Sequence, residues 1–347
     1  MKPPADFDAK RRLNDALVTF FRGSGSAKVS AFPSALSIDI NNNCNLRCPF
    51  CVNKFRRESG EVAGMMSFKR FKRVIDLLGP YLESINFGDK SEPTLNRDIY
   101  KMIGYASNKY NISCQLTTNF NRLSKEDARA LISSRLAFIN AGAEGVTQAT
   151  YGKYRVGGNL ARVVGNIRLV QKLKKAAGSE RPDITIQYIV FKHNERDIPK
   201  AKKAAAKLGV KLTLIPGAIF DIGGNYKDWL PENPKYSRYT IKNASVNGRK
   251  ALKISHKILK PHCTQPWSFM AIDANGSVYT CCGEHDADYS AGNIFKDRFG
   301  AIWNGRMFRD ARSYLAGKKT SGKGAVPCRK CCDLPREPEI YYPEGAE

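Results

Sequence analysis

The chain has 347 residues, of which 42% are hydrophobic and 26% charged, and its 57 Lys and Arg against 32 Asp and Glu give a formal net charge of +25. These values indicate a folded globular protein of one large domain or two ordinary ones, and no apolar run reaches the ~18 residues that a membrane span needs. The basic residues are dispersed along predicted helices and match no nucleic-acid-binding motif, so we interpret them as solvated helix faces. An anionic substrate or an acidic partner protein would fit the charge equally well.

The N-terminus lacks the uninterrupted apolar segment and the cleavage site of a secretory signal. We therefore expect a cytoplasmic protein, with residues 1–33 as an N-terminal extension. The chain has ten cysteines. In a reducing compartment closely spaced cysteines bind metal more often than they form disulfides, so the cysteine spacing becomes the main evidence on function.

From residue 34 onward, short β-rich runs alternate with amphipathic helical runs, which is the pattern of a parallel α/β sheet. The predicted strands cover residues 35–40, 84–88, 112–118, 136–141, 184–191 and 210–216. One predicted helix starts directly after Ser67, and four others cover residues 97–109, 124–133, 160–177 and 197–208. These βα units predict a doubly wound sheet or a partial barrel over residues 34–216, and in both folds the loops that follow the strands carry the site.

The composition changes near Gly217. Residues 217–260 contain Gly-Gly, several prolines and many Lys and Asn, so we expect a connecting segment there, followed by a cysteine-rich domain over residues 261–347. Within that domain, Asn275-Gly276 lies between alternating residues and predicts a β-hairpin over residues 271–281.

Three of the cysteines stand in "NNNCNLRCPFC", directly after the first predicted strand: Cys44, Cys48 and Cys51. A structural zinc ion takes four ligands, and no nearby His or Cys supplies the fourth. A [4Fe-4S] cluster normally takes four cysteines, so a cluster held by three keeps one iron open for another ligand. The spacing therefore favours a reactive iron–sulfur centre.

This Cys44-x3-Cys48-x2-Cys51 motif, with the aromatic Phe50 before its last cysteine, resembles the signature of radical SAM enzymes. The resemblance implies a partial (βα)6 TIM-like barrel and a [4Fe-4S] cluster whose open iron binds S-adenosylmethionine (SAM). It also implies that one electron, from a donor such as flavodoxin or ferredoxin, cleaves SAM to a 5'-deoxyadenosyl radical that takes hydrogen from the substrate.

Three further stretches resemble segments of this family. "NFGDKSEP" follows the second strand where the family's "GGEP" motif binds the SAM ammonium, which implies roles for Gly88 and Glu92; Ser91 replaces a usual glycine and Lys90 adds a charge. Thr118-Asn119 is similar to the family's "TNG" segment, with Phe120 in place of glycine. "GAEGVTQATYGKYRVGG" looks like a third segment of one branch, and places Glu144 among the SAM contacts.

The C-terminal part contains six more cysteines, enough for a second centre, and its pattern is similar to the SPASM/twitch extension of radical SAM enzymes. The resemblance implies an auxiliary [4Fe-4S] cluster held by Cys263, Cys281, Cys328 and Cys331, which makes two clusters in all. A structural zinc on the same thiolates is the alternative. Cys282 and Cys332 are then spare, and Cys282 is a candidate hydrogen donor. Cys114 lies in a β run and is expected to be an ordinary buried thiol.

Our leading hypothesis is an oxidoreductase that oxidises a small polar molecule, such as a sugar or aminocyclitol alcohol, with the auxiliary cluster accepting the electron. One alternative is a radical epimerase that uses Cys282. A second is a maturase of a ribosomally made peptide. Such proteins commonly carry an N-terminal leader-binding domain, and we expect the roughly forty residues before Cys44 to be too few for one, unless a separate protein supplies it. A non-enzymatic iron–sulfur protein is the third, and the open iron argues against it.

Overall fold

Six parallel strands run side by side in the order of the sequence and form the centre of the molecule. The structure, a computed structural model, describes residues 5–51, 53–54, 64–217, 226–246, 249–256, 263–281, 287–321, 326–330 and 340–343. The strands are β1 (Ala35–Ile38), β2 (Ser84–Phe87), β3 (Ser113–Thr118), β4 (Phe138–Gly142), β5 (Asp183–Val190) and β6 (Lys211–Pro216). All six predicted strands are confirmed, each with bounds within two residues of the prediction.

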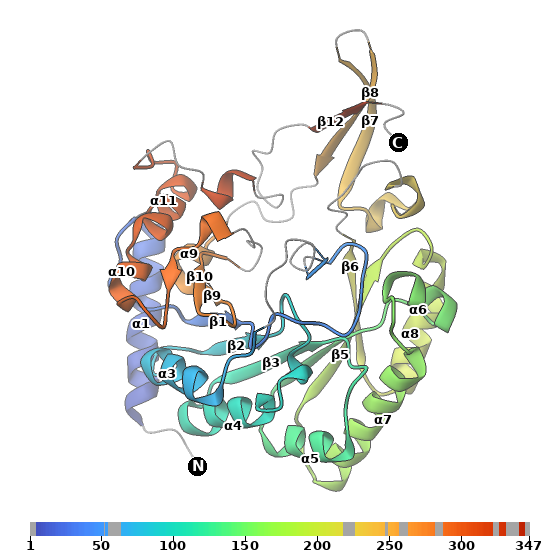
Figure 1. Ribbon diagram of the computed structural model, residues 1–347, viewed down its shortest axis with the longest axis horizontal. Helices are drawn as coiled ribbons and strands as arrows, with labels where there is room; N and C mark the ends of the chain where they lie inside the picture. Colours follow the sequence, from blue (N-terminus) through green and yellow to red (C-terminus); the bar gives the residue numbers. More distant parts are fainter. Residues whose placement is uncertain are drawn as a thin grey trace.

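A helix follows each of the first five strands, and Figure 1 shows these helices along the outer side of the curved sheet. They are α3 (Phe68–Leu78), α4 (Ile99–Tyr110), α5 (Lys125–Ser133), α7 (Leu160–Ala176) and α8 (Ile198–Lys207), and a short α6 (Gln148–Tyr154) precedes α7. Local sequence explains their limits. The Ser67 side chain accepts a hydrogen bond from the Arg70 amide at the start of α3, and Ser124 and Asp127 form a capping box on α5.

The core lies between this helical layer and the sheet. In α3 the buried residues Phe71, Val74, Ile75 and Leu78 follow helical spacing. They belong to the same hydrophobic cluster as the buried, helix-facing residues of β1 to β4. The architecture is a partial TIM-like (βα)6 barrel, and the loops that follow the strands gather at one edge.

The predicted C-terminal hairpin is confirmed, and it extends the same sheet. Strand β9 (Phe269–Ile272) pairs in parallel with β1, and β10 (Ser277–Tyr279) and β11 (Gly292–Asn293) follow it antiparallel. The sheet order is therefore β11-β10-β9-β1-β2-β3-β4-β5-β6. The cysteine-rich part of the chain thus begins on the strand next to the one that leads into the three-cysteine loop.

The N-terminal extension, for which no helix was predicted, forms helix α1 (Ala5–Gly23). The Arg11 guanidinium donates to the carbonyls of Gly79 and Tyr110, at 3.2 and 2.5 Å. The segment after α1 runs against the C-terminal helices α9 (Gln265–Ser268), α10 (Phe299–Trp303) and α11 (Arg306–Leu315). There the fully buried Arg312 donates to the carbonyls of Pro266 and Ala27, at 2.8 and 3.0 Å.

Strands β7 (Tyr239–Val246), β8 (Arg249–His256) and β12 (Ile340–Pro343) form a separate antiparallel sheet, seen at the top of Figure 1. Short 3-10 turns complete the described chain: η1 (Pro93–Leu95), η2 (Glu195–Asp197), η3 (Tyr226–Asp228), η4 (Pro234–Tyr236), η5 (Ala287–Tyr289) and η6 (Pro327–Lys330). Within the described ranges, no helix combines the length and apolar character needed to cross a membrane.

Candidate active site

The three-cysteine loop is fixed by backbone bonds and by two side chains that reach the sulfur atoms. The Cys51 amide donates to the Cys48 carbonyl at 3.3 Å, and the Arg47 amide donates to the Val156 carbonyl at 3.0 Å. The Asn119 side-chain amide lies 3.8 Å from the Cys44 sulfur, and the Arg155 guanidinium lies 3.9 Å from the Cys48 sulfur. The loop after β1 is thus held by residues that follow β3 and β4.

All three sulfur-bearing side chains line one cavity of about 170 Å³. The other walls come from the loop after β2, the ends of β3, β4 and β5, and the end of α6. Most of the predicted SAM-binding residues also lie here: Gly88, Glu92, Thr118 and Asn119. The structure therefore brings together predicted residues that are far apart in the sequence, such as Cys44 and Asn119, which are 75 positions apart.

Burial makes two of these thiols, Cys44 and Cys48, poor acids in the absence of a metal. Desolvation raises the pKa of Cys44, and it raises the pKa of Cys48 to about 12 although the Arg155 cation opposes the shift. Binding to iron supplies the positive charge that a buried thiolate needs. Free thiols spread around a cavity fit a four-iron cluster, because each cysteine of such a cluster binds a different iron.

No group of three or more His, Cys, Asp or Glu side chains in the described ranges is arranged to hold a metal ion. The three cysteines border a shared space and do not form such a ready-made site.

Glu92 is buried, and both of its carboxylate oxygens accept hydrogen bonds from the protein. One oxygen accepts from the Thr94 amide at 3.1 Å and from the Thr94 and Thr118 hydroxyls, both at 2.6 Å. The other accepts from the Asn119 amide at 2.7 Å. Three of these bonds fall on one oxygen and one on the other, which keeps room for a further donor. Glu92 therefore ties the loop after β2 to the end of β3, and its direct contact with the SAM ammonium stays a prediction.

Glu144 is also hydrogen-bonded within the protein, to Arg155, which was not among the predicted site residues. Its carboxylate accepts two hydrogen bonds from the Arg155 guanidinium, at 2.5 and 2.6 Å, and is fully buried. A Cβ on Gly142 would come within 2.2 Å of the same guanidinium. Gly142 therefore leaves room for Arg155, which lines the cavity beside Cys48. The signal for Arg155 was its place in the family-like stretch "YRVGG".

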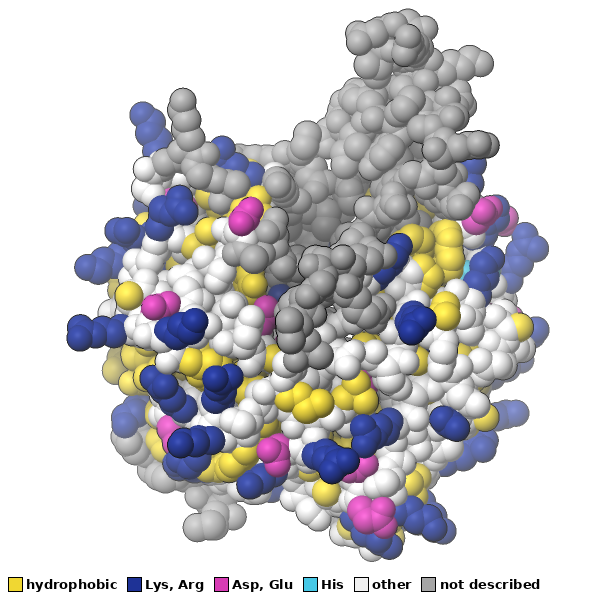
Figure 2. Space-filling view, in the orientation of Figure 1, with side chains coloured by type: hydrophobic (Ala, Val, Ile, Leu, Met, Phe, Trp, Pro, Cys, Tyr) yellow, Lys and Arg dark blue, Asp and Glu magenta, His cyan; other side chains and the backbone are white. Residues whose placement is uncertain are grey.

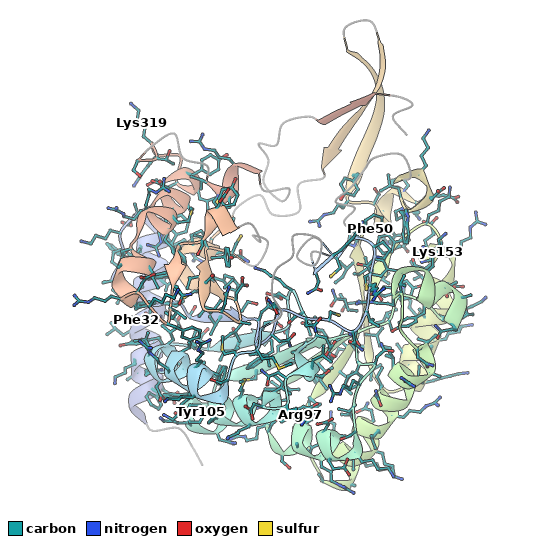
Figure 3. All side chains as sticks on the ribbon, in the orientation of Figure 1. Phe32, Phe50, Arg97, Tyr105, Lys153 and Lys319 are labelled. Carbon is teal, nitrogen blue, oxygen red and sulfur yellow. The ribbon has the colours of Figure 1, made fainter. Side chains whose placement is uncertain are left out.

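Phe50 lies outside the cavity lining, in an aromatic cluster behind the cysteine loop. Its ring centre is 4.9 Å from that of Trp229 and 6.1 Å from that of Phe191, and the Phe191 and Tyr154 rings are 4.7 Å apart. Figure 3 labels Phe50 and, on the same side of the molecule, Lys153. The cluster packs against Cys44, Cys48 and Cys51, so it keeps water from this side of the loop.

The loop after β2 carries a buried ion pair into the C-terminal hairpin. The Lys90 ammonium lies 3.5 Å from an Asp273 oxygen and 4.5 Å from the centre of the Tyr279 ring. Asp39, just after β1, accepts from the Lys90 amide and the Ser91 hydroxyl, both at 3.1 Å. Burial raises the pKa of Asp39 to about 7, although Lys90 opposes the shift. The two residues that depart from the family's "GGEP" segment thus both contact Asp39.

Asn194 caps the loop that follows β5. Its side chain accepts from the Phe191 amide at 2.8 Å and donates to the carbonyls of Glu144 and Ile189, both at 3.0 Å. His193 stacks on Phe191, and burial together with nearby Lys153 lowers its pKa to about 4.

The predicted auxiliary ligands come from three parts of the C-terminal domain. Cys263 precedes α9, Cys281 follows β10, and Cys328 lies in η6. Cys331 and the candidate hydrogen donor Cys282 lie outside the described residues. Cys114 is fully buried in β3, as expected for an ordinary core thiol.

Comparison with known proteins identifies both parts of the chain. A model of the radical SAM superfamily matches residues 38–205, and a model of the SPASM iron-sulfur cluster-binding domain matches residues 263–332. The chain belongs to the radical SAM superfamily. It carries a C-terminal SPASM domain, and the cofactors of these two domain types are iron–sulfur clusters and SAM.

The curated relatives of this radical SAM protein act in different ways. It is 25% identical over 187 residues to the tungsten-containing aldehyde ferredoxin oxidoreductase cofactor-modifying protein of Pyrococcus furiosus, covering 53% of this chain and 51% of that protein. It is 30% identical over 137 residues to the PqqA peptide cyclase of Rhodopseudomonas palustris, covering 39% of this chain and 35% of that protein. The chain thus matches about half or less of each relative.

Solved structures support the fold of this radical SAM protein. Streptococcus suis SuiB bound to S-adenosylmethionine superposes with a TM-score of 0.59 and 14% identity, covering 84% of this chain and 69% of that one. The structure titled native anSMEcpe with bound AdoMet gives a TM-score of 0.59 and 18% identity, covering 81% of this chain and 84% of that one. At these identities the likeness concerns the fold alone.

Proposed function

We propose that this radical SAM protein oxidises a small polar substrate, with a second iron–sulfur cluster accepting an electron from the substrate. When bound, the reduced cluster and SAM supply a 5'-deoxyadenosyl radical. In the oxidation of an alcohol, one hydrogen atom leaves the carbon, one proton leaves the oxygen, and one electron leaves for the auxiliary cluster. The protein must hold the substrate, accept the proton and offer the electron a path.

One observation carries the proposal: the hairpin that leads to Cys281 lies against the active-site loop. Strand β9 pairs with β1, and the Tyr279 ring contacts Lys90, which itself lines the cavity with the three cysteines. Cys281 is two residues beyond Tyr279. An auxiliary cluster held there would be close to the substrate, as an electron acceptor has to be.

We assign Cys44, Cys48 and Cys51 to the cluster that binds SAM, and Cys263, Cys281, Cys328 and Cys331 to the auxiliary cluster. Gly88, Thr118 and Asn119 would contact SAM. Glu92 and Glu144 would position its pocket through Thr118 and Arg155, respectively. The barrel would cover residues 34–216, the connecting segment residues 217–260, and the auxiliary domain residues 261–347.

Asp89 is our candidate for the group that receives the proton. It lines the cavity, accepts hydrogen bonds from the Ser37 hydroxyl and the Asn86 amide, and its pKa is raised by burial. A carboxylate of this kind also selects substrates with a hydroxyl or amino group to donate. This favours an alcohol or amine over an apolar substrate.

The test compares Cys281→Ala with Cys114→Ala under anaerobic turnover with candidate alcohols. Loss of the auxiliary acceptor should leave SAM cleavage within about threefold of wild type while oxidised product falls at least about a hundredfold. Cys114→Ala removes a thiol outside both sites and should keep both activities. Oxidised product at the wild-type rate in Cys281→Ala would overturn the proposal.

Peptide modification is the second candidate, because the matching relative from Rhodopseudomonas palustris is a peptide cyclase. Substrate identity separates the candidates. Incubation with peptides encoded beside the gene, followed by mass spectrometry, would show a mass change on the peptide only if this alternative holds.

A further inference from the structure

A second, larger cleft lies on the other side of the wall formed by Glu92 and Asn119. Its volume is about 680 Å³, and it opens between the start of α4, the loop after β3 and the start of α7. Three arginines from these three segments line it: Arg97, Arg122 and Arg162. Figure 3 labels Arg97 on the lower side of the view, away from Phe50.

The positive charge in this cleft is not balanced by ion pairs. All three arginines are exposed, and in the described part of the chain none has a carboxylate oxygen within 4.0 Å. The acidic residue in the lining, Asp127, accepts a hydrogen bond from the Ser124 amide at 3.2 Å within the capping box of α5. The cleft therefore presents guanidinium groups that attract an anionic surface.

The cleft is connected to the cysteine loop through very few residues. Asn121 lines the cleft and donates to the Asn119 carbonyl at 2.9 Å, and the Asn119 side-chain amide lies 3.8 Å from the Cys44 sulfur. Thr94 also lines the cleft, and its hydroxyl donates to Glu92, which lines the active-site cavity. One layer of residues thus separates the arginines from the proposed cluster.

We propose that this cleft, defined by Arg97, Arg122 and Arg162, is the docking site of a small acidic electron-transfer protein that delivers the electron for SAM cleavage. The inference rests on the proposed function, since it requires a reducible cluster on Cys44, Cys48 and Cys51. The electron enters at the side of Asn121, passes Asn119 and reaches the cluster beside Cys44, where it reduces the cluster by one electron.

Charge complementarity favours a protein over a small anion as the occupant. A specific small-anion site buries its cations and pairs them closely with the ligand, whereas these guanidinium groups are exposed around a wide opening. Exposed charges act at longer range and raise the rate of encounter. Transient electron-transfer complexes use small interfaces of this kind, and Figure 2 shows Lys and Arg widely spread over the visible face.

The experiment measures 5'-deoxyadenosine formation by the reconstituted full chain with two reductants. One is a bacterial flavodoxin, kept reduced by NADPH and its reductase; the other is dithionite, which needs no docking. The test variant is Arg97→Glu/Arg122→Glu/Arg162→Glu. The control is Lys202→Glu/Lys203→Glu/Lys207→Glu, which makes the same change in net charge at exposed positions of α8.

The arginine variant should lose at least about tenfold in the flavodoxin-driven rate and most of its salt dependence. Its dithionite-driven rate and the flavodoxin-driven rate of the control should stay within about twofold of wild type. The inference is overturned if the arginine variant keeps its flavodoxin-driven rate, if the control loses as much, or if flavodoxin cannot reduce the wild-type enzyme. Failure of wild-type cleavage with dithionite would instead contradict the proposed function.

Discussion

Lys90 and Ser91 show how single side chains can connect the loop after β2 to neighbouring parts of the fold. Both residues contact Asp39. The Lys90 side chain is only 2% exposed, and its ammonium group lies next to Asp273. Buried charges persist only when they are paired. The charge added at Lys90 is therefore compensated by the carboxylate of Asp273 in the C-terminal hairpin, and Asp39, just after β1, is a further acidic group near it.

Removing that cation should destabilise the fold strongly. Lys90→Met leaves Asp39 and Asp273 buried without their cation, so we expect the free energy of unfolding to fall by about 3 to 5 kcal/mol. Denaturant unfolding of the apoprotein measures this. Lys172→Met, at an exposed position of α7, is the control and should change it by less than about 0.5 kcal/mol. A similarly small effect for Lys90→Met would contradict the role of the ion pair.

Asp39 also predicts how stability depends on pH. Its pKa is raised to about 7 in the folded chain, chiefly by burial and then by Asp89 and Asp273, with Lys90 opposing, whereas an unfolded Asp titrates near about 3.9. The folded state therefore binds the extra proton. The stability from this group is present below pH ~4 and is lost as the pH rises through ~7, an effect of about 3 to 5 kcal/mol.

Chemical denaturation of wild type and Asp39→Asn between pH 4 and pH 8 gives the test. The difference in unfolding free energy between the two proteins should move in favour of Asp39→Asn as the pH rises. A difference that stays constant over this range would show that Asp39 titrates as an ordinary carboxyl.

Among the secondary-structure elements, the β9–β10 hairpin connects the two proposed metal sites. Its turn depends on Gly276, which has a φ of +94° and where a Cβ would meet the Phe295 ring at 2.3 Å. An L side chain is strained in this backbone region. The turn therefore fixes the path of the chain toward Cys281.

Gly276→Ala should disturb the auxiliary site and spare the SAM-binding site. We expect the reconstituted variant to lose about half of its iron, from about eight to about four per chain if both sites hold [4Fe-4S] clusters. Gly300→Ala is the matched control, because a Cβ there has no neighbour within 4 Å. Full iron content in Gly276→Ala would show that the auxiliary cluster does not depend on this hairpin turn.

The elements also show what could be predicted from the sequence. The six strands and five major helices were predictable because apolar spacing and caps such as Ser67 and Ser124 are local signals. The pairing of β9 with β1 was not, because it joins Phe269 to Ala35 across more than two hundred residues. The alternation of residues along a strand does not show which distant strand it pairs with.

For the candidate site too, some features could be predicted from the sequence and others could not. The cysteine motif and its neighbours Gly88, Thr118 and Asn119 were found by resemblance, and all of them line one cavity. The partnerships of Glu92 with Thr118, and of Glu144 with Arg155, could not be read from the sequence. Each depends on which buried donor lies within reach once the strands are packed, and that is a property of the tertiary structure.

For the whole molecule, one sheet joins the two family domains, and the two clefts lie on either side of a thin wall. The cavity beside the cysteines would form part of the SAM site, and the arginine-lined cleft would receive the electron donor. The net charge of +25 suits such a partner. On this view one electron enters past Asn119 and is used to cleave SAM, and another electron, from the substrate, leaves toward Cys281.

The central claim is that this chain uses an iron–sulfur cluster on Cys44, Cys48 and Cys51 to cleave SAM. The most direct measurement is 5'-deoxyadenosine formation after anaerobic reconstitution and reduction with dithionite, with wild type beside Cys44→Ala/Cys48→Ala/Cys51→Ala. The account predicts formation by wild type and none by the variant, which should keep about four irons at the auxiliary site. No 5'-deoxyadenosine from an iron-loaded wild type, or equal amounts from the variant, would contradict it.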